Sequence, residues 1–152
     1  MSAELKAPQG ASLGPVYVGD WAGLDDLTDE FFRAGARGLS YIYVSDEEAA
    51  IELSSAMEGV QILFAHYEAA DYSGDCFVLF EKAGRLYEVN GSHCSCHGLE
   101  GQWEPEETSA EAIRHRITEG SLGYADNDEA SYPMRTPFAK ELLAVLASIE
   151  PR

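Results

Sequence analysis

Hydrophobic and polar positions along the chain predict a β-hairpin near its middle. Residues 77–80 form a short apolar run, and residues 86–89 return with partly alternating apolar and polar side chains. Ala83 and Gly84 supply a turn between the two runs. Asn90-Gly91 is expected to end the second strand, because Asn and Gly tolerate positive φ angles. The pattern therefore predicts two antiparallel strands that are adjacent in the sequence.

Three further segments have the pattern of strands. Val16–Val18 is short and apolar, which predicts an edge strand, and Leu39–Val44 predicts another strand. Val60–Tyr67 is apolar at nearly every position. A strand of that kind is buried on both faces, so we expect Val60–Tyr67 to be central in the sheet.

Apolar residues at helical spacing predict two helices in the first half of the chain. Leu24, Leu27 and Phe31 indicate an amphipathic helix of about three turns. Ser45 and Glu48 form a capping box, which predicts a helix over Asp46–Met57. That helix is expected to bury Ala49, Leu53 and one of Ala50 and Ile51.

Two more helices are predicted in the second half. Thr108 with Glu111 makes another capping box, for a helix that ends near Thr118. Thr136-Pro137 predicts the start of the last helix, because proline suits the first helical position. The order of all these elements indicates an α+β fold, with a mainly antiparallel sheet of about 4–5 strands covered by about four helices. Residues 16–152 are expected to form this single domain, after a mobile lead-in at residues 1–15.

Net charge is the most unusual property of the composition. The chain has 27 acidic and 10 basic residues, for a net charge of −17. Such a chain repels nucleic acid and anionic membranes and favours basic partners. The alternative is a soluble acidic protein from an organism whose proteins are generally acidic. No apolar run approaches the roughly 20 residues of a membrane helix, and no secretory signal pattern is present, so a reducing cytoplasm is expected.

The acidic residues fall into four groups along the sequence. In one interpretation they are ordinary solvated helix faces, favoured by helix dipoles. In the other they form a recognition surface that imitates nucleic acid, which requires the carboxylates to be concentrated on one surface. Trp103 could anchor such an interface or cap the core. The partner-binding candidates are Asp25, Asp26, Asp29, Glu30, Glu47, Glu48, Glu52, Glu100, Trp103, Glu104, Glu106 and Glu107; the fourth group is Asp126, Asp128 and Glu129.

A stretch rich in cysteine and histidine follows the predicted hairpin. His93, Cys94, Cys96 and His97 are ligand types that zinc prefers, but only one residue separates the cysteines, where structural zinc sites usually have two to four. A more feasible zinc site combines Cys94 and Cys96 with His93 and the distant Cys76, or with His66. The alternatives are small apolar thiols with surface histidines, or a cysteine nucleophile activated by a nearby histidine.

Residues 71–107, DYSGDCFVLFEKAGRLYEVNGSHCSCHGLEGQWEPEE, resemble a stretch found in small uncharacterised proteins of tailed bacteriophages. The resemblance implies a phage origin and action in the cytoplasm of a bacterial host, and it carries over no catalytic residue. Small acidic phage proteins are often inhibitors of host defence, including anti-CRISPR and anti-restriction proteins.

Charge and resemblance together favour a non-enzymatic protein without a cofactor. It would occupy a basic nucleic-acid-binding surface on a host protein or nucleoprotein complex. The alternative is a small zinc protein or cysteine-dependent enzyme centred on Cys94 and Cys96, and a third hypothesis is a structural component of the virion.

Overall fold

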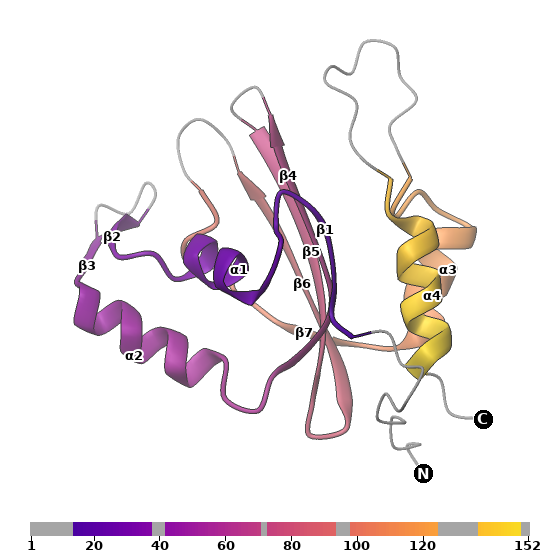
Figure 1. Cartoon of the computed structure of the whole chain (residues 1–152), viewed down its shortest axis with the longest axis horizontal. Coiled ribbons are helices and arrows are strands. Elements are labelled where there is room, and N and C mark those ends of the chain that lie inside the picture. The colour runs from indigo at the N-terminus through magenta and orange to yellow at the C-terminus, as the bar shows by residue number, and fades with distance from the viewer. Residues whose placement is uncertain (1–13, 38–41, 71–72, 94–97, 125–136, 150–152) are drawn as a thin grey trace.

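A central sheet lies between two layers of helices (Figure 1). The structure, a computed structural model, describes residues 14–37, 42–70, 73–93, 98–124 and 137–149. The expected α+β fold with a sheet of five strands and four helices is confirmed. The elements in chain order are β1 (Val16–Gly19), α1 (Leu24–Phe31), β2 (Gly35–Arg37), β3 (Ile42–Val44), α2 (Asp46–Ala56), β4 (Gln61–Ala70), β5 (Ser73–Lys82), β6 (Arg85–His93), β7 (Glu106–Thr108), α3 (Ala110–Thr118) and α4 (Ala139–Ile149).

The main sheet has the strand order β1-β4-β5-β6-β7, and β2 pairs with β3 in a separate two-stranded sheet. Strands β4 to β7 are antiparallel to their neighbours, whereas β1 runs parallel to β4. The short first strand is thus at an edge, and β4 has a partner on each side, as its apolar pattern predicts. None of the described helices is long and apolar enough to cross a membrane.

The hairpin of β5 and β6 turns at Ala83 and Gly84, which have φ angles of 54° and 78°. Two residues with positive φ match the right-handed twist of the flanking strands. The expectation that Asn90-Gly91 ends the second strand is wrong, because β6 continues to His93. Asn90 and Gly91 pair with residues of the long strand β5, and this ladder outweighs their local preference for a turn.

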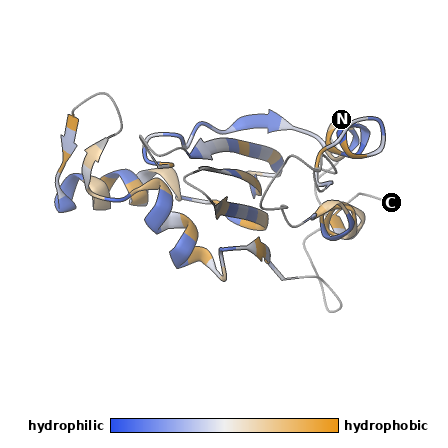
Figure 2. Cartoon of the chain, turned by 90° about the horizontal axis from the view of Figure 1, so that it is seen from above, coloured by the Kyte–Doolittle hydropathy of each residue, from blue (hydrophilic) through white to orange (hydrophobic). Residues whose placement is uncertain are grey.

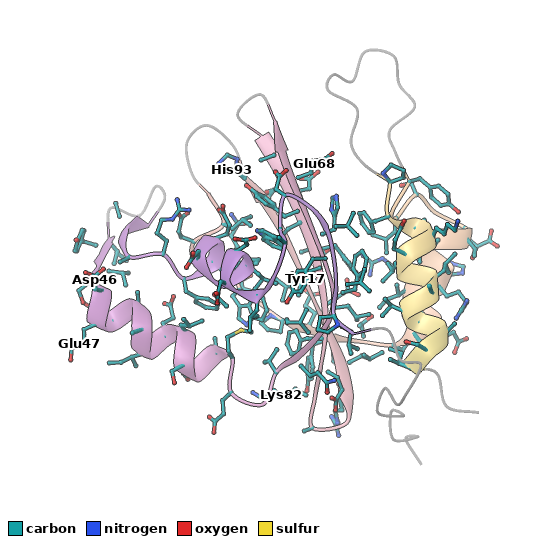
Figure 3. All side chains as sticks on the ribbon, in the orientation of Figure 1. Tyr17, Asp46, Glu47, Glu68, Lys82 and His93 are labelled. Carbon is teal, nitrogen blue, oxygen red and sulfur yellow. The ribbon has the colours of Figure 1, made fainter. Side chains whose placement is uncertain are left out.

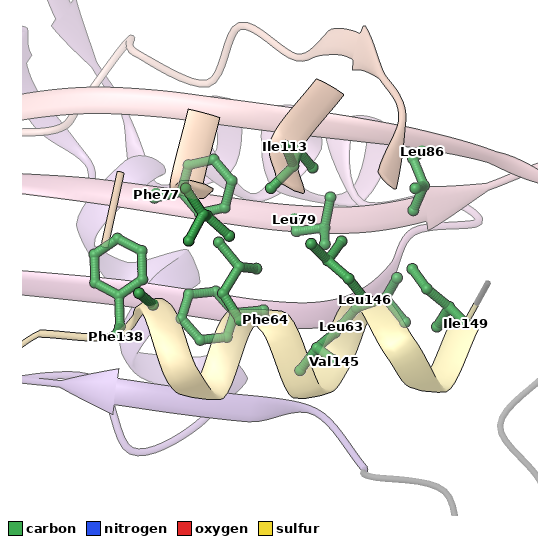
Figure 4. Packing of buried hydrophobic residues seen from close by; sticks show 13 residues of the cluster. Leu63, Phe64, Phe77, Leu79, Leu86, Ile113, Phe138, Val145, Leu146 and Ile149 are labelled. Atoms are coloured by element: carbon green, nitrogen blue, oxygen red, sulfur yellow. The ribbon is translucent and has the colours of Figure 1, made fainter. Parts of the chain in front are cut away.

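Each face of the sheet is covered by its own apolar cluster. Side chains of β4, β5 and β6 pack against α3 and α4 on one face, where Phe64, Leu79 and Leu146 are fully buried (Figure 4). On the other face, Val78 and Phe80 pack against Leu27 of α1, with α2 at the margin. Burial on both faces explains why β4 and β5 contain almost continuous apolar runs.

The start of α2 agrees with the capping rules, whereas the starts of α3 and α4 are shifted from the predicted positions. Helix α4 begins at Ala139 and not at Pro137, because the carbonyl of Phe138 accepts the first helical hydrogen bond while the Phe138 amide bonds to the Gly123 carbonyl. Ser45 caps α2 by accepting a hydrogen bond from the Glu48 amide at 3.1 Å, as predicted. The cap of α3 is Ser109 and not Thr108: the Ser109 hydroxyl accepts from the Ala112 amide at 3.0 Å. Thr108 instead belongs to β7, because it pairs with Leu86 at the edge of the sheet.

Candidate partner-binding surface

The acidic and basic residues of the helices are unevenly distributed between the two sides of the sheet. The helices on one side, α1 and α2, contain eight acidic residues and no basic residue. The helices on the other side, α3 and α4, contain two acidic residues against three lysines and arginines. Since α1 and α2 both contribute to the apolar cluster on the same face of the sheet, two of the four acidic groups lie in one layer. We call α1 and α2 together the acidic layer.

Helix α1 presents most of its carboxylates to solvent. Asp25 and Asp26 lie in its first turn, where the helix dipole favours negative charge. Asp26 also accepts a hydrogen bond from the Ala22 amide at 2.8 Å, which fixes the chain entering the helix. Asp25 and Asp29 are exposed, and Glu30 is half-buried toward the sheet. Asp25 and Asp29 are therefore the carboxylates of α1 that can contact a partner without breaking a hydrogen bond seen in the structure.

Helix α2 carries the second acidic group at its amino-terminal end. Asp46, Glu47 and Glu48 form its first turn and are exposed. Figure 3 shows Asp46 and Glu47 at the outer end of the helix, away from the main sheet. Glu48 is engaged in the cap, because its carboxylate accepts from the Ser45 hydroxyl at 3.1 Å. Glu52 lies one turn further along and is also exposed.

The structure brings Glu100 to the acidic layer, although it is distant in sequence. Arg33 lies 3.8 Å from Glu30 and 3.8 Å from Glu100 through its two terminal nitrogens, so it links the end of α1 to the segment after β6. Trp103 of the same segment packs on Phe31 and Phe80, with ring centroids 5.0 and 5.5 Å away. Trp103 thus contributes to the core under the acidic layer.

The remaining predicted residues lie at the edge of the sheet or beyond the described ranges. Glu104 is exposed, and Glu106 and Glu107 belong to the edge strand β7. Glu107 lies 3.4 Å from Arg85, which offsets part of its charge. The fourth acidic group, residues 126–129, lies outside the described residues, so its position relative to the acidic layer stays a prediction.

Glu30 of the acidic layer raises the pKa of two groups that are buried beneath it. The pKa of the Tyr67 hydroxyl is raised to about 12, mainly by burial and in addition by the charges of Glu30 and Asp20, against a lowering effect of Arg33. The pKa of the Cys76 thiol is likewise raised to about 12, mainly by burial, against the lowering effect of a hydrogen bond with the Gly91 backbone and with a smaller raising effect of Glu30. Cys76 therefore stays protonated at neutral pH, and a thiol in that form is a poor nucleophile.

Only part of the candidate zinc site can be located. Cys94, Cys96 and His97 lie outside the described residues. Cys76 pairs with Gly91, and Gly74 pairs with His93, so Cys76 and His93 are on the same face of the sheet. His66 is on the opposite face, where its ring stacks on Phe138 at 4.3 Å. The described residues contain no group of three or more histidines, cysteines or carboxylates suited to a metal ion, and zinc binding by Cys94 and Cys96 stays a prediction.

Several apolar side chains are exposed in the structure, and the prediction that α2 buries one of Ala50 and Ile51 is wrong, because both are exposed. Leu24 and Ile51 occupy apolar helical positions, yet they are 46% and 64% exposed. Ile42 and Tyr43 of β3 are 61% and 72% exposed. All four residues belong to α1, α2 or the strand leading into α2, so they lie among the acidic groups. A helical position tells which residues share a face, but not whether another element covers that face.

Comparison with protein-family models, with curated proteins and with solved structures finds no match for this chain.

Proposed function

We propose that this protein is a non-enzymatic binding protein whose acidic layer occupies a basic, nucleic-acid-binding surface on a bacterial defence complex. The observation that carries the proposal is the separation of charge across the sheet: eight acidic residues on α1 and α2, and a nearly balanced set on α3 and α4. A charge of one sign gathered on one surface attracts a surface of the other sign and accelerates its association.

The anchoring of α1 in the core also supports this function. The carboxylates stand on two helices, and the core residues Leu27 and Phe31 anchor α1 to the sheet with no exposure to solvent. Charges held in place before binding lose little conformational freedom when a partner docks. The resemblance of residues 71–107 to tailed-phage proteins supplies the biological setting, in which nucleic-acid-binding defence complexes are the basic targets.

Charge-neutralising variants with a matched control test the proposal. The test variant is Asp25→Asn/Asp29→Asn/Glu47→Gln, which avoids the carboxylates that cap α1 and α2. The control is Glu111→Gln/Glu119→Gln/Glu141→Gln, which removes the same charge from exposed positions on or beside α3 and α4. The readout is DNA binding by a panel of purified RNA-guided nucleases and restriction enzymes, measured by gel shift with increasing amounts of each variant.

We expect the wild-type protein and the control to displace DNA from the target complex. The test variant should need about tenfold more protein for the same displacement, because three attractive charges are lost. Raising the salt from about 50 to about 300 mM should weaken the displacement sharply, since it shortens the Debye length. Displacement that is insensitive to salt, or equal losses in both variants, would contradict an electrostatic binding surface.

A further inference from the structure

The outward face of α2 has no covering element among the described residues. Ala49 is the one buried residue of this helix, and Leu53 and Ala56 are partly buried against the core. Ala49, Leu53 and Ala56 follow the helical spacing of one face. Ile51 is displaced by about 200° from Ala49 at about 100° per residue, so it points away from the core. Its exposed fraction of 64% agrees with that direction.

Acidic and small side chains surround Ile51 on this face. Glu47 and Glu48 precede it by one helical turn, and Ser54 and Ser55 follow it by one turn. A shallow depression in the surface is lined by Ile51, Ser54, Ser55, Met57 and Glu58. The outward face of α2 therefore presents an apolar side chain next to two small ones, with carboxylates at both ends.

The ribbon of β2 and β3 comes directly before α2 in the chain and exposes two further apolar side chains. Successive side chains of a strand point to opposite faces, yet the neighbours Ile42 and Tyr43 are both exposed, at 61% and 72%. Figure 2 shows β2 and β3 standing apart from the main sheet. A two-stranded ribbon with three residues per strand is marginal by itself, so contact with a partner would stabilise it.

We propose that the face of α2 around Ile51 binds a basic protein segment that carries an apolar side chain between lysines or arginines. The inference rests on the proposed function and names the part of the partner that α2 recognises. Charge complementarity selects this occupant. A second copy of the chain would place Glu47, Glu48 and Glu58 against identical carboxylates, while nucleic acid and anionic lipid are themselves negative and would be repelled.

Two synthetic peptides of equal positive charge test the recognition of an apolar group by α2. One has lysine and leucine at helical spacing, and the other has lysine and serine in the same order. Each is titrated into the isotopically labelled full-length protein at about 50 mM salt, where charge attraction is strong. The measurement is the change in backbone amide NMR shifts and the dissociation constant derived from it.

Ile51→Ser is the test variant, and Tyr124→Ser is its matched control. Tyr124 is 56% exposed and follows α3, so its substitution removes an exposed apolar side chain outside the acidic layer. We expect the lysine-leucine peptide to shift amides of α2 near Ile51, and Ile51→Ser to weaken its binding about tenfold. Tyr124→Ser should leave that binding unchanged, and the lysine-serine peptide should bind more weakly than the lysine-leucine peptide.

The outcomes separate this inference from the proposed function. Equal affinity for both peptides, unchanged by Ile51→Ser, would overturn the apolar contact and leave the electrostatic function intact. Binding of neither peptide would overturn both. A wild-type dimer in sedimentation equilibrium that Ile51→Ser dissociates would show that a second copy occupies α2, and would also overturn the inference.

Discussion

The Nη1 atom of Arg116 lies 2.6 Å from Oε1 and 2.8 Å from Oε2 of Glu88, so one guanidinium nitrogen bridges both oxygens of a buried carboxylate. Asn90 donates a further hydrogen bond to Oε1 at 2.9 Å. Glu88 belongs to β6 and Arg116 to α3, and the pair therefore joins the helix to the face of the sheet that it covers. An inward-facing glutamate in a strand is costly to bury without such a partner.

Removing the arginine should destabilise the fold. In Arg116→Met the Glu88 carboxylate stays buried and loses its cation, and we expect the free energy of unfolding to fall by about 2 kcal/mol. Urea unfolding at neutral pH measures the change. Lys140→Met, at an exposed position of α4, is the matched control and should shift the midpoint little. Equal effects of the two substitutions would mean that the Glu88–Arg116 pair contributes nothing beyond net charge.

The same pair should make stability depend on pH in the acid range. Burial raises the pKa of Glu88, but the hydrogen bonds from Arg116, Asn90 and Thr108 outweigh burial, so its pKa lies below the ordinary 4.5. Below pH 4.5 the unfolded chain therefore takes up a proton more readily than the folded protein. The stabilisation by Glu88 is complete above that pH, and it is lost as pH falls through the lower folded pKa.

Glu88→Gln isolates this contribution from the other carboxylates. The stability difference between the wild type and Glu88→Gln should be constant between neutral pH and about pH 5, and should shrink as the pH falls further toward about 3. Urea unfolding of both proteins across this range gives the difference directly. A difference that stays constant with pH would show that Glu88 has the same pKa in the folded and unfolded chains.

The buried thiol of Cys76 predicts an effect in the alkaline range. Burial raises its pKa from 9.0 to about 12, so above pH 9 the unfolded chain loses this proton before the folded protein does. Stability should therefore decrease from about pH 9 upward, and Cys76→Ala should show a smaller decrease than the wild type. Urea unfolding at pH 8 and at pH 10 is the measurement, and identical slopes for both proteins would contradict the assignment.

Close packing between β5, β6 and the segment after β6 predicts that substitution of Gly91 destabilises the fold. A Cβ atom at Gly91 would lie 2.9 Å from Cys76 Sγ, 3.2 Å from Gln102 Oε1 and 3.2 Å from a methyl group of Leu99. Such crowding costs about 1–3 kcal/mol, so Gly91→Ala should lower the free energy of unfolding by that amount. Adding Cys76→Ala, which removes the nearest crowding atom, should recover part of the loss.

The double-mutant cycle of Gly91→Ala and Cys76→Ala measures this recovery by urea unfolding. Strictly additive losses of unfolding free energy would mean that there is no repulsive contact between the two positions. Gln102 is the further contact in this region. The side-chain oxygen of Gln102 accepts a hydrogen bond from the Ser92 backbone amide at 2.9 Å, and its side-chain nitrogen donates to the backbone carbonyls of Ser92 and Gly98 at 2.7 Å each. A shift of the surrounding chain would break these hydrogen bonds, so it would relieve the crowding only at a cost in free energy.

Local pattern alone predicted the elements with strong periodicity. The hairpin turn at Ala83-Gly84 and the cap at Ser45 depend on contacts between residues close in sequence, so their physical causes lie in the local sequence. Strand β4 is predictable from its own run of apolar residues, although the elements that cover its two faces are distant in sequence. The α+β class followed from the order of these elements. The short strands β2 and β7 were missed, because three-residue strands with polar or small side chains have no periodicity to detect.

For the candidate surface, the sequence by itself determined how many carboxylates there are and which helices carry them. Only the tertiary structure decided that α1 and α2 share one side of the sheet, that Arg33 brings Glu100 to them, and that Ile51 faces outward while Leu53 faces the core. Helical periodicity assigns residues to faces. Which face is covered depends on how segments distant in sequence pack together, and that choice is made by burial over the whole fold.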